Sequence, residues 1–183
     1  MDTQDQPSIL VQVDVQHVDA EIAWTRDAHH RVEIRPVRRE IAPLKKENAT
    51  PVKLTLDIIQ RPRTNAFEYQ INGKPFWKAS AIPARIGETQ LWTVTNNSPW
   101  SHPLHLHGFF FQVLDPNGEP LRPLTWKDTL EVPYKQSREL LVLFDERPGT
   151  WMVHCHILDH AEGGLMTTVQ LGDGPAARHA HVP

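Results

Sequence analysis

The residues of this sequence best suited to chemistry are histidines, and they are clustered. Six of the eleven histidines and the single cysteine lie in two short segments, residues 102–108 (His-Pro-Leu-His-Leu-His-Gly) and residues 154–164 (His-Cys-His-Ile-Leu-Asp-His-Ala-Glu-Gly-Gly). Imidazole nitrogen and thiolate sulfur are ligands of transition metals. The clustering therefore predicts metal binding and not histidines scattered over exposed loops.

The spacing of these ligands predicts two sites rather than one. Side chains alternate between the two faces of a β-strand, so in an extended segment the cysteine points away from the histidine on either side of it. In the other segment His105 and His107 share a face, whereas His102 is an odd number of residues away and can face the opposite side. One predicted set holds Cys155, His102 and His160, the last of which the chain reaches after a short turn. The other holds His105, His107, His154 and His156.

The composition of each set indicates the metal. One thiolate with two imidazoles is the ligand set of blue-copper electron-transfer sites. Four imidazoles without a thiolate suit copper that binds and reduces dioxygen. Zinc also uses cysteine and histidine, but the alternating faces of His-Cys-His do not converge on one tetrahedral ion. The residues therefore predict an electron-input copper site that Cys155 connects to an oxygen-reducing one.

The motif His-x-x-His-x-His, followed later in the chain by His-Cys-His-x-x-x-His, closely resembles the last two copper motifs of multicopper oxidases, the laccase-like family. The resemblance covers roughly residues 50–172, and residues 69–76 and 126–129 also resemble segments of that family. It implies a cupredoxin fold and three kinds of copper site. By resemblance, His102, Cys155 and His160 bind the type 1 copper, His105 binds the type 2 copper, and His107, His154 and His156 bind the type 3 pair.

The resemblance also implies an activity, that of a copper-dependent oxidase. A small reducing substrate would give electrons to the type 1 copper. Cys155, with His154 and His156 as the catalytic residues beside it, would carry them to a trinuclear copper cluster that reduces dioxygen to water. Phenols, aromatic amines and metal ions all fit as reducing substrates.

The point of electron entry is expected to be a histidine ligand of the type 1 copper, His160 or His102. Trp100 and Asp159 are close enough in sequence to contribute to the substrate pocket there.

Two features depart from the family pattern. The axial position above the type 1 copper corresponds to Leu165, which cannot ligate; Met166, the alternative ligand, should face away in a regular strand. The family's trinuclear cluster uses four His-x-His pairs, and only two occur here in that context, since residues 179–181 lack the family's neighbouring residues.

These departures define what the chain is expected to supply. The type 1 site would be complete, whereas the type 2 and type 3 sites would be only partly supplied. Missing N-terminal cupredoxin domains, or a partner chain, would contribute the other histidine pairs. The alternative is an isolated blue-copper electron-transfer module without oxidase activity.

Composition excludes several other functions. The net charge of the 183-residue chain is −3, so no basic excess favours nucleic acid as a partner. No apolar run reaches membrane-spanning length, so no membrane partner is expected. The first six residues do not resemble a signal peptide, although the family resemblance implies a periplasmic or extracellular location.

The pattern of the remaining sequence is that of an all-β protein. Alternation predicts strands at residues 9–18, 52–58, 67–71, 88–96, 138–144, 150–156 and 165–171, with a tight turn at Asn72-Gly73. Residues 109–111, three phenylalanines, are expected to extend the ligand strand and to pack in the core. Short strands at this spacing predict a Greek-key β-sandwich of the cupredoxin-like kind.

Three regions are expected along the chain. Two prolines and a charged run within residues 42–51 predict a linker. Residues 1–49 would be an N-terminal extension, a remnant of the junction with a preceding domain. Residues 50–172 would form the cupredoxin-like copper-binding domain, and residues 173–183 a flexible tail.

Overall fold

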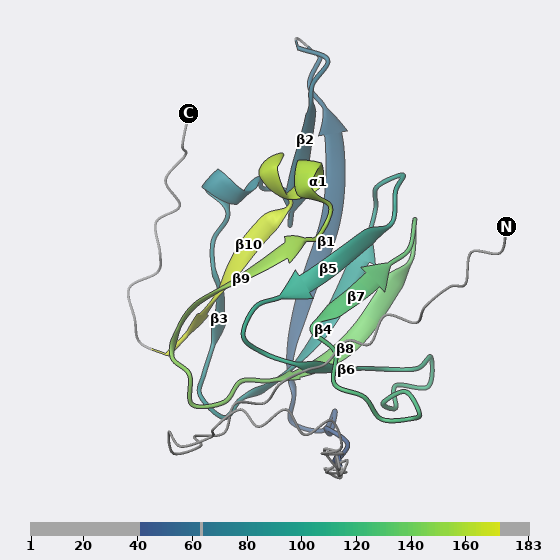
Figure 1. The fold of residues 1–183 in the computed structure, drawn as a ribbon, viewed down its shortest axis with the longest axis vertical. Coiled ribbons are helices and arrows are strands. Elements are labelled where there is room, and N and C mark those ends of the chain that lie inside the picture. Colours follow the sequence, from purple (N-terminus) through teal and green to yellow (C-terminus); the bar gives the residue numbers. More distant parts are fainter. Residues whose placement is uncertain (1–40, 63, 173–183) are drawn as a thin grey trace, which may run out of the picture. The chain divides into compact units, whose positions relative to one another are not determined.

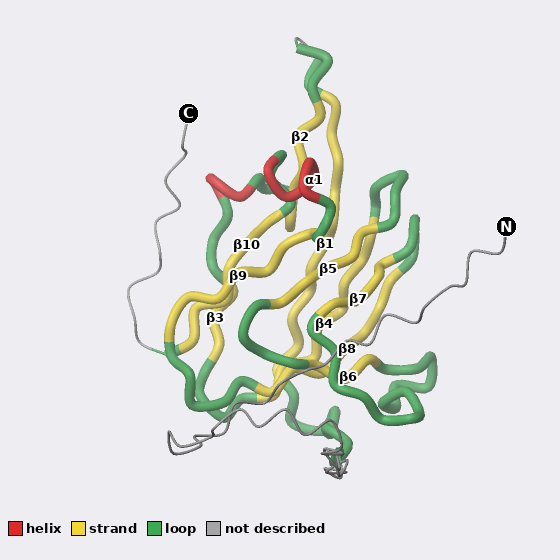
Figure 2. Tube along the Cα trace, in the orientation of Figure 1, coloured by secondary structure: helices red, strands yellow, loops and turns green. Residues whose placement is uncertain are grey.

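Two five-stranded β-sheets pack face to face (Figure 1, Figure 2). The structure, a computed structural model, describes residues 41–62 and 64–172. The first sheet has the order β2-β1-β4-β8-β6 and consists of β1 (Thr50–Gln60), β2 (Phe67–Ile71), β4 (Thr89–Asn96), β6 (Phe111–Val113) and β8 (Ser137–Leu143). The second has the order β3-β10-β9-β5-β7 and consists of β3 (Ile82–Ala84), β5 (His102–Leu106), β7 (Thr129–Val132), β9 (Gly149–Cys155) and β10 (Met166–Leu171).

Two short helices complete the described elements. A 3-10 helix, η1 (Phe76–Lys78), follows β2, and α1 (Leu158–Glu162) connects β9 to β10. No helix in residues 41–62 and 64–172 is long and apolar enough to cross a membrane.

Alternation along the strands separates the core from the outer surfaces. In β4 every second residue is buried, and in β5 and β9 the buried positions include Leu104, Leu106 and Val153. These inward faces pack against one another, as in other aligned sandwiches. The fully buried apolar side chains include Leu54, Leu56, Trp92, Val94, Leu106, Leu140, Val142, Phe144, Val153, Val169 and Leu171.

The predicted all-β sandwich is confirmed, and so is the turn at Asn72-Gly73. Both turn residues have positive φ, 52° and 69°, which the two-residue hairpin turn requires. The described part of the chain contains ten strands, and the sequence analysis did not predict β3 or β7 as strands. The strand predicted at residues 9–18 lies outside the described residues.

The prediction for residues 109–111 was wrong in two respects. These residues do not extend the ligand strand, because β5 ends at Leu106 and the chain turns at Gly108, where φ is +73°. Phe109 and Phe111 are buried as predicted, but Phe110 is 55% exposed. The turn at Gly108 reverses the chain, so that residues 111–113 join the first sheet as β6.

Gly108 provides a test of how tightly this turn is packed. A Cβ atom at Gly108 would clash with the ring of Trp151, whereas one at Gly87, where φ is +79°, would meet nothing within 4 Å. Gly87→Ala should therefore lower the free energy of unfolding by only about 1 kcal/mol, for the left-handed backbone alone. Gly108→Ala should lower it by roughly 2–5 kcal/mol, because overpacking adds to the same backbone cost. Urea unfolding of both variants measures the difference, and equal losses would contradict the packing argument.

Candidate metal centre

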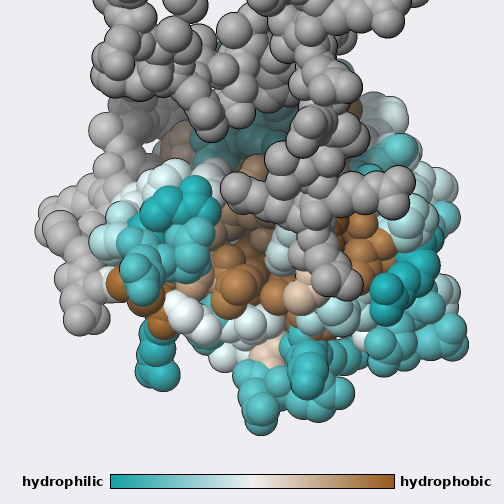
Figure 3. All heavy atoms as spheres, turned by 60° about the horizontal axis from the view of Figure 1, so that its bottom comes forward, coloured by the Kyte–Doolittle hydropathy of each residue, from teal (hydrophilic) through white to brown (hydrophobic). Residues whose placement is uncertain are grey.

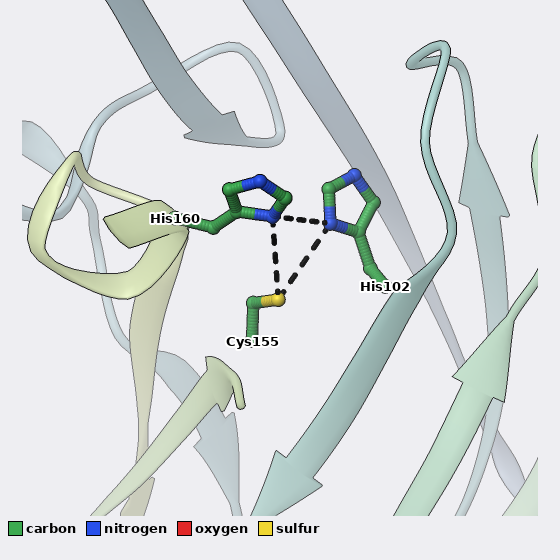
Figure 4. Close-up of side chains that lie close together, drawn as sticks. All are labelled: His102, Cys155 and His160. Carbon is green, nitrogen blue, oxygen red and sulfur yellow. Dashed lines mark hydrogen bonds between the residues drawn. The ribbon is translucent and has the colours of Figure 1, made fainter. Parts of the chain in front are cut away.

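Cys155, His102 and His160 meet inside the sandwich and form what we call the inner cluster (Figure 4). The sulfur lies 3.6 Å from Nδ1 of His102 and 3.7 Å from Nδ1 of His160, and the two Nδ1 atoms are 3.2 Å apart. Cys155 and His102 are fully buried, and His160 is 9% exposed. The sequence analysis predicted that these three residues form one set, and the structure brings them together.

The size of this triangle fits a single metal ion. Nitrogen donors at about 2.0 Å and a sulfur donor at about 2.3 Å from one ion, as around zinc, would lie about 3.3–3.7 Å from one another. The three observed separations are close to these values. One thiol and two imidazole nitrogens also make the His/His/Cys donor set that copper accepts in trigonal sites.

The turn after β9 brings His160 back to Cys155. The Ile157 backbone N–H donates to the sulfur of Cys155 at 3.4 Å, and the His160 N–H donates to the Ile157 carbonyl at 3.1 Å. α1 is followed by Gly163 and Gly164, where a Cβ atom would meet Tyr69 or Pro75. The short turn predicted between the cysteine and the second histidine is therefore a single turn of helix, packed against β2.

In this structure the environment favours the neutral forms of all three groups. Burial, together with a smaller effect of the neighbouring His160, lowers the pKa of His102 to about 4. Burial also lowers the pKa of His160 and raises the pKa of the Cys155 thiol. Neutral imidazole is the form that binds a metal, and a bound ion would remove the proton of the thiol.

The outer cluster lies on the opposite face of the same sheet. His105, His107 and His154 have nitrogens within 4.8 Å of one another, and Nε2 of His107 is 2.8 Å from Nε2 of His154. The His156 ring lies 5.2 Å from the His105 ring and 5.7 Å from the His154 ring, between ring centres. All four predicted histidines therefore gather at one place, with His107 and His156 exposed.

Backbone carbonyls determine which nitrogen faces this cluster. Nδ1 of His105 lies 3.0 Å from the Asp128 carbonyl oxygen, and Nδ1 of His154 lies 2.8 Å from the Cys155 carbonyl oxygen. Because a carbonyl only accepts, each Nδ1 must carry the proton and donate it. Nε2 of each ring then carries a lone pair, and that of His154 faces Nε2 of His107.

Pairing of β5 with β9 explains why the clusters lie on opposite faces. His105 is opposite His154, and Leu104 is opposite Cys155. Residues opposite one another in a ladder share a face. Cys155 thus points into the core with Leu104, while the histidine pair points outward.

The register of β10 places the two candidate axial residues. Met166 pairs with His154 and so lies on the outer face, whereas the Leu165 carbonyl accepts the Cys155 N–H at 3.1 Å. Leu165 is fully buried. This arrangement favours Leu165, not Met166, as the residue on the side of the inner cluster.

Aromatic side chains surround the ring of His160. Tyr69 stacks on it at 4.7 Å and Trp100 at 5.9 Å, between ring centres. Trp100 is 43% exposed and contacts Phe67, which is 49% exposed. Trp100 was predicted to lie near this site, but sequence reasoning missed Tyr69 and Phe67, because their strand reaches the site only through tertiary packing.

Sequence reasoning also missed Ser98 and Asn96, which reach the inner cluster through His102. Asn96 is the last residue of the strand predicted at residues 88–96, and Ser98 lies just beyond that strand. No short-range pattern indicates that either side chain reaches a histidine of the inner cluster.

Comparison with known proteins bears on both clusters. A protein-family model described as multicopper oxidase matches residues 45–174, a segment that contains all seven cluster residues. Among curated proteins, Multicopper oxidase MmcO of Mycobacterium tuberculosis is 33% identical over 101 residues, which cover 55% of this chain and 19% of that protein. Laccase of Haloferax volcanii is 31% identical over 125 residues, which cover 65% of this chain and 21% of that protein.

Solved structures agree with these matches. The McoA multicopper oxidase of Aquifex aeolicus aligns with a TM-score of 0.61 and 28% identity, over 73% of this chain and 31% of that one. The chain spans about a fifth of the length of the curated relatives named above.

The low pKa of His102 predicts how the stability of the metal-free protein depends on pH. Its pKa is about 4 in the folded chain against 6.5 for an exposed histidine, so the unfolded chain takes up this proton first as pH falls. The contribution of His102 to stability is therefore complete above about pH 6.5 and decreases as pH falls toward 4. Over that window the free energy of unfolding should fall by roughly 2–3 kcal/mol more in the wild type than in a His102→Gln variant. Urea unfolding at several pH values measures this, and parallel profiles would argue against a neutral, buried His102.

Proposed function

Because this chain belongs to the multicopper oxidase family, we propose that it is the C-terminal part of a laccase-like copper oxidase, with a small reducing substrate as electron donor and dioxygen as acceptor. The observation that carries the proposal is the division of faces along one strand. The Cys155 thiol joins an inner set of donors, while the histidines on either side of it join an outer set.

Each cluster would hold a different kind of copper. In this proposal the inner cluster is the type 1 site, with His102, Cys155 and His160 as ligands. His105 would bind the type 2 copper, and His107, His154 and His156 would bind the type 3 pair. Copper at these positions would supply one-electron chemistry at the inner cluster and the reduction of dioxygen to water at the outer one.

The chain itself links the two clusters. Cys155 is covalently bonded to His154 and His156, and its carbonyl oxygen accepts the Nδ1–H of His154 at 2.8 Å. Electrons can therefore cross the sheet through the backbone of one residue without a diffusing carrier. This supports the assignment of Cys155, His154 and His156 as the catalytic relay.

The exposure of the ligands favours His160 over His102 as the point of electron entry. His102 is fully buried, whereas His160 lies nearer the surface beneath the half-exposed Trp100. A cavity of about 380 Å³ is lined in part by Phe67, which contacts Trp100, and by Gly163, the residue that follows α1. Phenols, aromatic amines and metal ions all remain consistent with this opening.

The outer cluster supports the proposal that further domains or a partner chain complete it. Its four imidazoles lie on an outer face, and two of them are exposed. Trinuclear copper needs more ligands than four imidazoles provide. Preceding cupredoxin domains, in the same or another chain, would supply them.

Exposed apolar side chains on the sandwich also support contact with such a neighbour. Viewed from the lower end of Figure 1, hydrophobic residues are exposed among hydrophilic ones (Figure 3). Phe110, Trp126 and Leu143, each at least 39% exposed, line a cavity of about 180 Å³. Exposed apolar area of this kind supports contact with another domain.

A second candidate function is a one-copper electron-transfer module. It is favoured by the burial of the inner cluster within this chain, whereas the outer cluster is partly exposed. For either function we propose a periplasmic or extracellular location, which rests on the family resemblance.

Substitution of Cys155 tests the assignment of the two clusters. Cys155→Ser should abolish the intense blue absorption of the copper-loaded chain, because that absorption requires the thiolate. His156→Ala, the matched change one residue away on the other face, should retain it. Loss of colour in both variants, or in neither, would contradict the division of faces.

Copper content per chain separates the two candidate functions. One copper in the assembled protein favours the electron-transfer module, and four favour the oxidase.

The axial position gives a paired test. Leu165→Met, a volume-conserving change, should lower the reduction potential of the blue copper and alter its visible spectrum, because it adds a thioether on the inner side. Met166→Leu should leave both unchanged, because Met166 lies on the other face. A spectral change in Met166→Leu would instead identify Met166 as the axial ligand.

A further inference from the structure

Asn96 and Ser98, which precede β5, form a buried polar pair that ends on His102. Ser98 Oγ lies 2.6 Å from Nε2 of His102, the ring nitrogen that faces away from the inner cluster. Asn96 is 1% exposed and Ser98 is 2% exposed. Burying polar side chains is costly unless each finds a partner, so the arrangement of this pair is constrained.

Backbone carbonyls fix the orientation of the Asn96 amide. Its Nδ2 donates to the carbonyl oxygens of Trp100, Val132 and Pro133 at 2.6, 3.0 and 3.2 Å. Because a carbonyl only accepts, the NH₂ group must lie on that side and Oδ1 must face Ser98. Oδ1 then accepts the backbone N–H of Ser98 at 2.9 Å.

The orientation of Asn96 determines the direction of the Ser98 hydroxyl. That hydroxyl has one proton, and the two oxygens that can take it, Oδ1 of Asn96 at 2.8 Å and the carbonyl of Trp100 at 3.1 Å, can only accept. These two acceptors favour donation of the hydroxyl proton away from His102. With the proton so placed, Ser98 Oγ acts as an acceptor toward His102.

We infer that Asn96 and Ser98 are positioning residues that hold His102 in its Nε2–H tautomer, so that the lone pair of Nδ1 is presented to a metal ion in the inner cluster. Nδ1 of His102 is the atom that faces both the Cys155 sulfur and the His160 ring (Figure 4). Metal-binding histidines generally donate their second ring nitrogen to an acceptor that fixes the tautomer. Here the acceptor is the Ser98 hydroxyl. Three backbone carbonyls orient the Asn96 amide, and that amide in turn orients the hydroxyl. The inference rests on the proposed metal-binding role of the inner cluster.

The same pair also holds Trp100, the aromatic side chain that covers the His160 imidazole. Asn96 and Ser98 both bond to the backbone of Trp100, whose indole stacks on His160. One network therefore orients one ligand directly and holds the aromatic side chain beside the other.

The tautomer itself can be measured in the metal-free chain of residues 1–183. Two-bond ¹H–¹⁵N NMR at pH 7 distinguishes the two forms, and loss of a signal in His102→Gln identifies His102. The wild type should show the Nε2–H form. Ser98→Ala removes the acceptor and should introduce the Nδ1–H form, whose proton can be donated to Nδ1 of His160. Ser98→Thr, which keeps the hydroxyl, should restore the wild-type form.

Copper binding provides a second readout. Loss of an outer hydrogen-bonding partner typically weakens metal affinity by roughly tenfold or more. If Cu(II), which relies more on imidazole donation, loses ten times more affinity than Cu(I), the reduction potential rises by about 59 mV. Ser137→Ala, the same change at an exposed serine that bonds Thr95, should alter neither the tautomer nor the potential.

Two outcomes would overturn the inference: a wild-type tautomer together with a wild-type potential in Ser98→Ala, or a Ser98→Thr protein that behaves like Ser98→Ala. If Ser98→Ala does not fold, Ser98→Cys gives the same readouts, because a thiol is a weak acceptor. A wild-type chain that binds no copper would refute the proposed function instead, and the NMR result on the metal-free chain is independent of that failure.

Discussion

The alternation of side chains along β9 is the constraint on which the rest of the structure depends. A strand has a period of two, so a thiol and the imidazoles next to it cannot enter the same space. In this sandwich one face of β9 is the core and the other is an outer surface. A slip of one residue against β5 would exchange the faces, placing Cys155 outside and His154 among leucines. The pairing of β9 with both β5 and β10 is therefore what separates the two clusters.

The backbone contributes as much to the two clusters as the ligands do. Carbonyl oxygens can only accept hydrogen bonds, and they orient three of the histidines. They act directly on His105 and His154, and on His102 through the Asn96–Ser98 pair. The arrangement has an energetic basis, because a buried N–H that faces no acceptor is costly. The tautomers are thus set by the fold before any metal arrives, and less of the binding free energy is needed to reorganise the ligands.

Much of this site could be predicted from the sequence because its determinants are local. Two short motifs contain all seven cluster residues. The parity of their spacing assigns the residues in extended segments to a face, whereas His160 returns to Cys155 through a turn. The parts that escaped prediction depend on residues far apart in the chain. Tyr69 reaches His160 only after β2 packs against α1, and the environment of Ser98 depends on the end of β7. β3 is three residues long and pairs with β10 in parallel, a contact that no short-range pattern encodes. Phe110 resembles its two neighbours in sequence but is exposed because Gly108 redirects the chain.

The enclosure of the inner cluster has a kinetic consequence. Cys155 and His102 have no solvent contact, and the third donor lies on a five-residue helix. If the proposed ion is bound there, it would enter or leave when α1 or the loop before β5 opens transiently, so the frequency of that local opening would govern its exchange. The same closure limits the access of soluble oxidants to a thiol whose pKa is raised by burial. Retention of a bound ion would then depend on residence time as well as on equilibrium.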